Sequence, residues 1–239
     1  MTQITLDIET VPSQMPGARD QIRASIKPPG TLKKAESIAA WWMNDSESAV
    51  EEAFRKQSLD GGLHGEIISI AALYADRHWV SCRAVGESES ELLHAFFNAV
   101  ENWQREDAAA LLGTRHDDAG AWPQDPPHPV AHNAPFDLGF LWRRARVLGV
   151  PVPTWLPGPL CREGRDFTDT MTLWAGRCNR VGLAALCRAL SVPTSKGDLD
   201  GSQVLDAWLR GETERIAKYN LADVVATRDV WQRLQGGAA

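Results

Sequence analysis

Four carboxylates constrain this chain more than any other feature, because each lies at a position that a fold would bring inward. In residues 3–10, strict alternation places Ile4, Leu6 and Ile8 on one face of a strand. Asp7 and Glu9 therefore share the opposite face and point the same way. Acid pairs also occur on solvated strand edges, so this pair alone does not define a site.

The acid nearest the C-terminus is Asp223, in a helix predicted over residues 216–234. Tyr219 and Asp223 fall within the apolar arc of this helix, and their i, i+4 spacing places one above the other. A buried carboxylate without a partner is costly. Asp223 therefore requires a cation, which is either a metal ion or an arginine.

Asp137 lies in the first turn of another predicted helix. A short apolar strand over residues 129–132 precedes it, and Asn133 is expected to cap the helix N-terminus. Gly149 marks the expected helix end. An aspartate in a first turn often interacts only with the helix dipole, so structural and functional interpretations both stay open.

Together these segments resemble the three motifs of the DEDD superfamily of 3′-5′ exonucleases. The corresponding runs are Leu6-Asp7-Ile8-Glu9-Thr10, Asn133-Ala134-Pro135-Phe136-Asp137 and Tyr219-Asn220-Leu221-Ala222-Asp223. A lysine at position 218, where one subclass has histidine, together with Tyr219 indicates the tyrosine, or DEDDy, subclass. Residues 182–227 are similar to small bacterial proteins related to the proofreading domain of family-B DNA polymerases.

The resemblance implies that Asp7, Glu9, Asp137, Tyr219 and Asp223 are catalytic, and that the four acids bind two divalent metal ions. Asp7 would bridge both ions, Glu9 and Asp223 would complete the shell of one, and Asp137 would reach the other through water. Tyr219 would orient or help deprotonate the attacking water. Two carboxylates about 4 Å apart repel by about 4 kcal/mol at an effective dielectric of about 20, and oxygen ligands favour Mg²⁺ or Mn²⁺ over zinc.

The implied reaction releases nucleoside monophosphates from the 3′ end of single-stranded DNA or RNA. DNA is preferred because of the proofreading resemblance, since no sequence feature reads a 2′-hydroxyl. An RNA or short-oligonucleotide exonuclease of the same mechanism is the first alternative, and a non-catalytic nucleic-acid-binding domain is the second. Substrate contacts are predicted at Thr10, Asn133, Phe136 and Lys196, although a structural role also accounts for Asn133 and Phe136.

Length and composition indicate one α/β domain over residues 1–239, with insertions at about 12–65 and 106–129. The expected fold is ribonuclease H-like, a mixed five-stranded sheet flanked by helices. Strands over residues 3–10, 66–74 and 79–85 would form an antiparallel meander. Helices are predicted at 32–43, 47–57 and 89–103, an exposed loop over 106–129, and a fifth strand near 167–171 in which Asp169 is structural.

The charge of the chain limits the ways in which it can bind nucleic acid. A net charge of −6 argues against a protein that coats nucleic acid through a broad basic face. Arg143, Arg144 and Arg146 follow the second motif and either flank a phosphate track or lie on a solvated helix face.

Absence of a long apolar run or leader predicts a cytoplasmic protein without a membrane partner. Four cysteines without C-x-x-C spacing predict reduced thiols. No organic cofactor is expected. The first insertion is expected to form a lid or rim.

Overall fold

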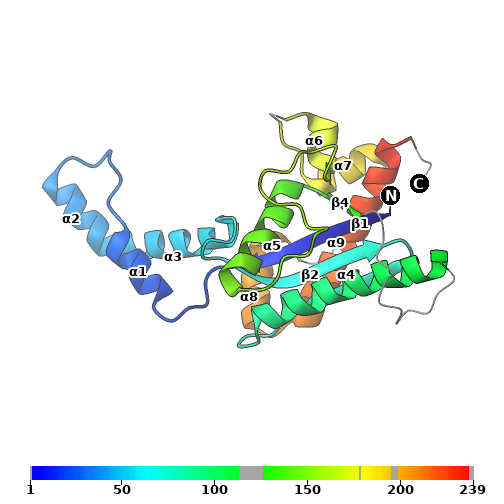
Figure 1. The fold of residues 1–239 in the computed structure, drawn as a ribbon. Coiled ribbons are helices and arrows are strands. Elements are labelled where there is room, and N and C mark those ends of the chain that lie inside the picture. Colours follow the sequence, from blue (N-terminus) through cyan, green and yellow to red (C-terminus); the bar gives the residue numbers. More distant parts are fainter. Residues whose placement is uncertain (1, 113–125, 178, 195–198, 237–239) are drawn as a thin grey trace.

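The centre of the molecule is a mixed five-stranded sheet, which confirms the predicted architecture (Figure 1). The computed structural model describes residues 2–112, 126–177, 179–194 and 199–236. Strand order is β3-β2-β1-β4-β5, with the first three strands antiparallel and β4 and β5 parallel to β1. The strands are β1 (Gln3–Val11), β2 (Glu66–Tyr74), β3 (Arg77–Cys82), β4 (His128–Ala131) and β5 (Thr168–Asp169).

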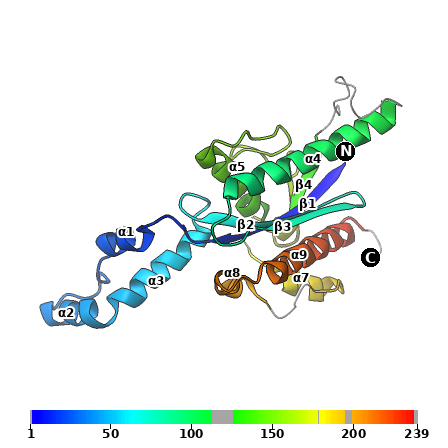
Figure 2. The same ribbon diagram turned by 90° about the horizontal axis from the view of Figure 1, so that it is seen from below.

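Helices cover both faces of the sheet, and the alternation in β1 decides which residues meet which layer (Figure 2). Ile4, Leu6 and Ile8 enter the main core on the side of α4 (Glu89–Leu112) and α5 (Ala134–Leu148). The opposite face, which carries Asp7 and Glu9, is covered by α9 (Thr213–Leu234). Each buried Ile or Leu contributes about 1.5–3 kcal/mol, so the apolar residues hold the acidic face toward α9.

Small residues on β2 let α9 approach the acids of β1. The strand register pairs Glu9 with Ser69 and Asp7 with Ala71. Residues directly opposite each other in neighbouring strands project to the same face, and both small residues are fully buried there. Helix α9 packs against β1 and β2, which brings Asp223 to the acidic face.

The second motif begins its helix in a way that the sequence did not predict. Asn133 is the N-cap residue of α5, as predicted, but it adopts the left-handed conformation (φ 66°, ψ 44°) and its side chain makes no capping hydrogen bond. Its backbone N–H instead donates to Asp169 Oδ1 at 2.8 Å. Asp169 also accepts from the backbone N–H of Met171 at 2.9 Å, at the start of α6 (Thr170–Ala175), so its side chain has a structural role. The helix ends at Gly149 (φ 69°), as predicted.

Several predicted boundaries shift. Strand β3 spans Arg77–Cys82 rather than 79–85, because the hairpin turns at Ala75 (φ 53°) and Asp76. Helix α4 runs to Leu112, so the loop predicted from 106 is wrong over residues 106–112, where Ala108 and Ala109 are buried against the core. The part of that predicted loop at 113–125 lies outside the described residues. In the described part of the chain, no helix is long and apolar enough to cross a bilayer.

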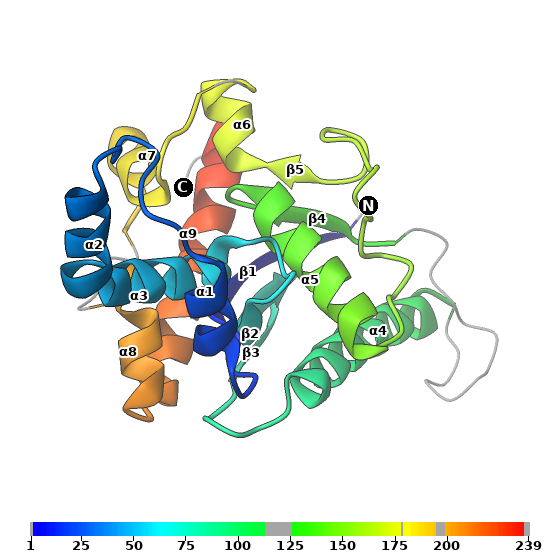
Figure 3. The same cartoon turned by 90° about the vertical axis from the view of Figure 1, so that its left-hand side faces the viewer.

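The first insertion forms an arm that projects past the end of β1 (Figures 1 and 3). It contains α1 (Ala18–Ser25), α2 (Ala35–Asn44) and α3 (Ser46–Lys56), followed by the short 3-10 helix Gln57–Leu59. The sequence predicted only the last two helices, because α1 buries a single residue and carries no apolar stripe. At the base of the arm, Thr10 Oγ1 donates to the Ser58 carbonyl at 2.7 Å. Arg55 also pairs with Asp206 of α8 (Val204–Leu209) at 2.9 Å.

One of the arginines after the second motif is a core residue. Arg144 is 6% exposed and binds both carboxylate oxygens of Glu89, with the Nη2–Oε2 distance at 2.6 Å. Glu89 Oε1 also accepts from the backbone N–H of Ile67 at 2.8 Å. This buried network joins α5, α4 and β2, so Arg144 is excluded from the predicted phosphate track.

Candidate metal centre and catalytic site

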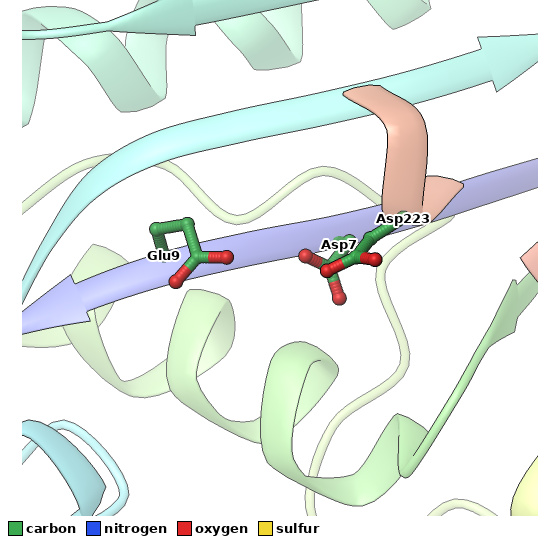
Figure 4. Close-up of side chains that lie close together, drawn as sticks. All are labelled: Asp7, Glu9 and Asp223. Atoms are coloured by element: carbon green, nitrogen blue, oxygen red, sulfur yellow. The ribbon is translucent and has the colours of Figure 1, made fainter. Parts of the chain in front are cut away.

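Three of the four predicted acids come together beside β1. One carboxylate oxygen from each of Asp7, Glu9 and Asp223 lies within 4.8 Å of the others. The pleat of β1 supplies the first two, and α9 brings Asp223 to the same place from the opposite end of the chain (Figure 4). All three side chains are half-buried, so they remain accessible while much of their hydration is lost.

Asp137 is held close to this cluster by the backbone of β1. Strand β4 pairs with β1 only as far as Thr5, so the next part of that strand edge lacks a β-partner. Asp137, in the first turn of α5, accepts the Ile8 N–H through Oδ1 at 3.1 Å and is 3% exposed. Its second oxygen does not belong to the three-residue group, and Asp137 therefore stands next to the cluster without forming part of it.

The acids strongly disfavour their ionised forms when no cation is present. Burial raises the pKa of Asp7 well above its usual range, and the charges of Asp137, Glu9 and Asp223 raise it further. Burial, followed by the charges of Asp223 and Asp137, likewise raises the pKa of Glu9. Burial also raises the pKa of Asp137 to about 8, against the lowering effect of its hydrogen bond from Ile8. The acids can therefore ionise together at neutral pH only when a cation neutralises their charge.

Lowering the pH is expected to stabilise the metal-free protein. The pKa of Asp137 is about 8 in the folded state against an ordinary value of 3.8, so between these values the folded state binds more protons than the unfolded state. Stability then rises as the pH falls through this window. Melting temperatures measured in EDTA between about pH 8 and about pH 5.5 test this. Asp137→Asn, which keeps an acceptor for Ile8, should weaken the dependence, and a melting temperature that rises with pH would contradict it.

Tyr219 lies one helical turn before Asp223 and is hydrogen-bonded to its carboxylate. Burial raises the pKa of Tyr219, and the charges of Glu9 and Asp223 add to the effect. The hydroxyl therefore keeps its proton and acts as a donor. Its ring packs beside a cluster that contains Val11, Ile68 and Trp208, which fixes its position at the edge of the acids.

The donor set fits a divalent cation. Oxygen ligands of Mg²⁺ lie about 2.1 Å from the ion, so opposite ligands are about 4.2 Å apart. A spread of 4.8 Å among the three acids is close to this geometry and needs only small side-chain adjustments. Because the three residues offer only carboxylate oxygens, the set suits hard cations. Asp7, Glu9 and Asp223 can hold one ion.

A cavity of about 490 Å³ opens directly beside Glu9. Thr10 and Phe136, two of the predicted substrate contacts, line it, although the Thr10 hydroxyl is already bonded to Ser58. Asn133 does not line this cavity, and Lys196 lies outside the described residues. The opposite wall comes from the arm, through Arg55 and Leu59 among others. Sequence patterns missed these wall residues, because only the tertiary fold brings the end of α3 next to Glu9.

Comparison with known protein families gives a match over the C-terminal part of the chain. Residues 122–238 match the model of a family described as a predicted 3′-5′ exonuclease related to the exonuclease domain of PolB. The match includes Asp137, Tyr219 and Asp223, whereas Asp7 and Glu9 precede it. No curated protein shows significant similarity to the chain. The mixed sheet flanked by helices is consistent with the ribonuclease H-like fold of such exonucleases. Residues 122–238, just under half of the chain, are thus similar to the family of predicted 3′-5′ exonucleases related to the exonuclease domain of PolB.

Proposed function

We propose that the protein is a DEDDy-type exonuclease that removes nucleoside monophosphates one at a time from the 3′ end of single-stranded nucleic acid, with DNA preferred. The observation that carries this proposal is the convergence of Asp7, Glu9 and Asp223 within 4.8 Å, with Tyr219 bonded to Asp223. The family match supports the exonuclease class. The preference for DNA follows from the relation of that family to a DNA polymerase domain.

Each acid has a distinct task in the proposed mechanism. Two divalent cations, Mg²⁺ or Mn²⁺, would supply charge stabilisation for the attacking and leaving oxygens of the displacement. Asp7 would serve both ions, Glu9 and Asp223 would complete the ligand set of one, and Asp137 would support the other through water. Asp137 is well placed for an indirect role, because one of its oxygens is already committed to the Ile8 N–H.

The reaction is an in-line hydrolysis of the last phosphodiester. Water attacks the phosphorus, the bond to the 3′-oxygen of the preceding nucleotide breaks, and that oxygen takes a proton. The products are a nucleoside 5′-monophosphate and a strand shortened by one residue. The Tyr219 hydroxyl donates its proton to Asp223, and its oxygen can accept a hydrogen bond from the water and so orient the water for attack. The raised pKa of Tyr219 argues against a role as the base.

The cavity beside Glu9 suits an unpaired terminal nucleoside. Its volume of about 490 Å³ falls within the range of about 300–1,000 Å³ typical of small-molecule sites. Phe136 offers an aromatic surface on which a base can stack. A base pair would have to open before its nucleotide could enter such a cavity, which supports the preference for single strands.

Replacing Tyr219 with phenylalanine is expected to lower kcat by about 10- to 100-fold with little change in KM, because the ring stays and only the water-orienting hydroxyl is lost. The measurement is steady-state hydrolysis of a single-stranded oligonucleotide. Tyr74→Phe is the matched control, since Tyr74 packs near Trp103 at the opposite end of the sheet core. Equal losses in both variants would contradict the assigned role.

The direct test is a time course on 5′-labelled single-stranded DNA and RNA of matched sequence, in Mg²⁺, Mn²⁺ or EDTA. A ladder that shortens one nucleotide at a time from the 3′ end, and that disappears in EDTA, would support the proposal and identify the preferred sugar. Absence of cleavage in both metals, together with no metal binding by calorimetry, would overturn it in favour of a non-catalytic binding domain.

A further inference from the structure

A second depression continues from the cavity beside Glu9. It has a volume of about 690 Å³ and lies between the base of the arm and the exposed face of α5. Leu59 lines both this groove and the cavity, so the two are contiguous. The arginine groove, as it is called below, is lined by residues 59–63, Arg143, Arg146 and Val147.

The positive charge of the arginine groove is not neutralised by neighbouring acids. Arg143 Nη1 donates to the Gly61 carbonyl at 3.0 Å, and Arg146 lies over the Trp142 ring at 5.2 Å. Neither forms an ion pair with a carboxylate among the described residues, in contrast to Arg144 between them, which is paired with Glu89. Two guanidinium groups thus remain available in a protein whose net charge is −6.

The one acid in the lining does not offset this charge. The carboxylate of Asp60 is turned into its own loop, where it accepts hydrogen bonds from the backbone N–H groups of residues 62 to 65. Asp60 also contacts the His64 ring at 2.9 Å. Its charge is therefore taken up by the turn, and the groove presents arginine to solvent.

Apolar side chains accompany the arginines. Leu59 is 70% exposed, Leu63 69% and Val147 58%, although each lines the groove. Exposed apolar side chains next to unpaired guanidinium groups form a surface that can contact bases and phosphates at once. An acidic peptide would satisfy the arginines equally well, but continuity with the cavity through Leu59 favours a ligand that extends from the cavity.

We propose that the arginine groove binds the nucleotides on the 5′ side of the scissile phosphate, with Arg143 and Arg146 on successive backbone phosphates. The inference rests on the proposed exonuclease function, because the cavity then holds the 3′-terminal nucleoside and the strand must leave it. The arm contributes residues 59–63 to this path and lies outside the residues matched to the exonuclease family. The groove is therefore a substrate-binding element that α5 and the insertion form together.

Salt dependence of binding tests the groove without requiring hydrolysis. Fluorescence polarisation in EDTA would follow a 5′-labelled single strand of about 12 nucleotides at several salt concentrations. In the variant Arg143→Gln/Arg146→Gln, Kd should rise about tenfold. The slope of the logarithm of the association constant against the logarithm of the salt concentration should fall in magnitude by about 1.4, which is about 0.7 for each lost phosphate contact. A labelled dinucleotide should lose less affinity than the longer strand.

Two further variants separate charge from folding. Arg143→Lys/Arg146→Lys keeps both charges and should retain most of the slope, while Arg177→Gln/Arg188→Gln removes two exposed arginines that do not line the groove and should leave the slope unchanged. An unchanged slope in the Gln variant of the groove, or an equal loss in the Arg177/Arg188 control, would overturn the proposal. Preferred binding of an acidic peptide over the single strand would overturn it in favour of a protein partner. If no strand is cleaved in Mg²⁺ or Mn²⁺ while the slope still falls, the exonuclease assignment fails and the groove stands as a strand-binding surface.

Discussion

Replacing Asp7 with asparagine is expected to reduce kcat by at least about 10³-fold, equivalent to about 4 kcal/mol of transition-state stabilisation. The charges of Asp137, Glu9 and Asp223 all raise the pKa of Asp7, so its carboxylate interacts with each of the other three acids. Asparagine keeps the shape but removes the charge that would hold both cations. The measurements are kcat on a single-stranded oligonucleotide and calorimetric titration with Mn²⁺, in which the variant should lose at least one binding event.

The same substitution should stabilise the protein when metal is absent, because it relieves repulsion among buried carboxylates. A melting temperature in EDTA that equals or exceeds that of the unsubstituted protein would show that activity is lost without loss of folding. Asp76→Asn provides the control, since Asp76 is exposed in the turn between β2 and β3. Residual activity above about one tenth in Asp7→Asn would be incompatible with a two-metal site centred on this residue.

Replacing Glu89 with alanine is expected to lower the free energy of unfolding by about 3–5 kcal/mol, because it leaves the buried Arg144 guanidinium without its counterion. The backbone N–H of Ile67 would lose its acceptor as well. Urea denaturation followed by circular dichroism measures the change. Glu47→Ala removes an exposed partner of Arg23 and should change the free energy of unfolding far less, because solvent screens that pair.

A second variant shows whether the loss at Glu89 arises from the uncompensated charge. Glu89→Leu/Arg144→Met replaces both members of the pair with apolar side chains and should recover most of the stability. If Glu89→Ala were no more destabilising than Glu47→Ala, the pair would have to be hydrated in solution. Recovery in the double variant would instead assign the effect to the charge.

The acids of the site could be predicted from sequence because local periodicity determines their direction. Asp7 and Glu9 share a strand face through the two-residue repeat, and Asp223 shares a helix face with Tyr219 through the four-residue spacing. Asp137 could be assigned to a helix start, but its bond to Ile8 depends on where β4 stops pairing with β1. The Ile8–Asp137 hydrogen bond forms only once the sheet is assembled, so no local sequence pattern predicts it.

The predictions that failed share one cause, because each concerned a residue or helix whose interaction partner lies far away in the sequence. Asparagine is a residue type that favours helix caps, yet the side chain of Asn133 does not cap α5. The backbone N–H of Asn133 instead donates to Asp169, and this bond holds Asn133 in the left-handed region. Arg144 is indistinguishable in sequence from Arg143 and Arg146, and only the position of Glu89 makes it a core residue. Helix α1 lacks an apolar stripe because it packs on α3 largely through exposed ion pairs.

The two ends of the arm lie next to each other on the body of the protein. Ser13 follows the end of β1, and its backbone N–H donates to Gln57 Oε1 at 3.3 Å. The Thr10 hydroxyl donates to the carbonyl of Ser58. Because these ends are close together, the segment between them can be lengthened, shortened or exchanged without altering strand pairing. Changes in α1 and α2 should therefore leave strand pairing intact, whereas changes in residues 58–63 would alter the walls of the cavity and of the arginine groove.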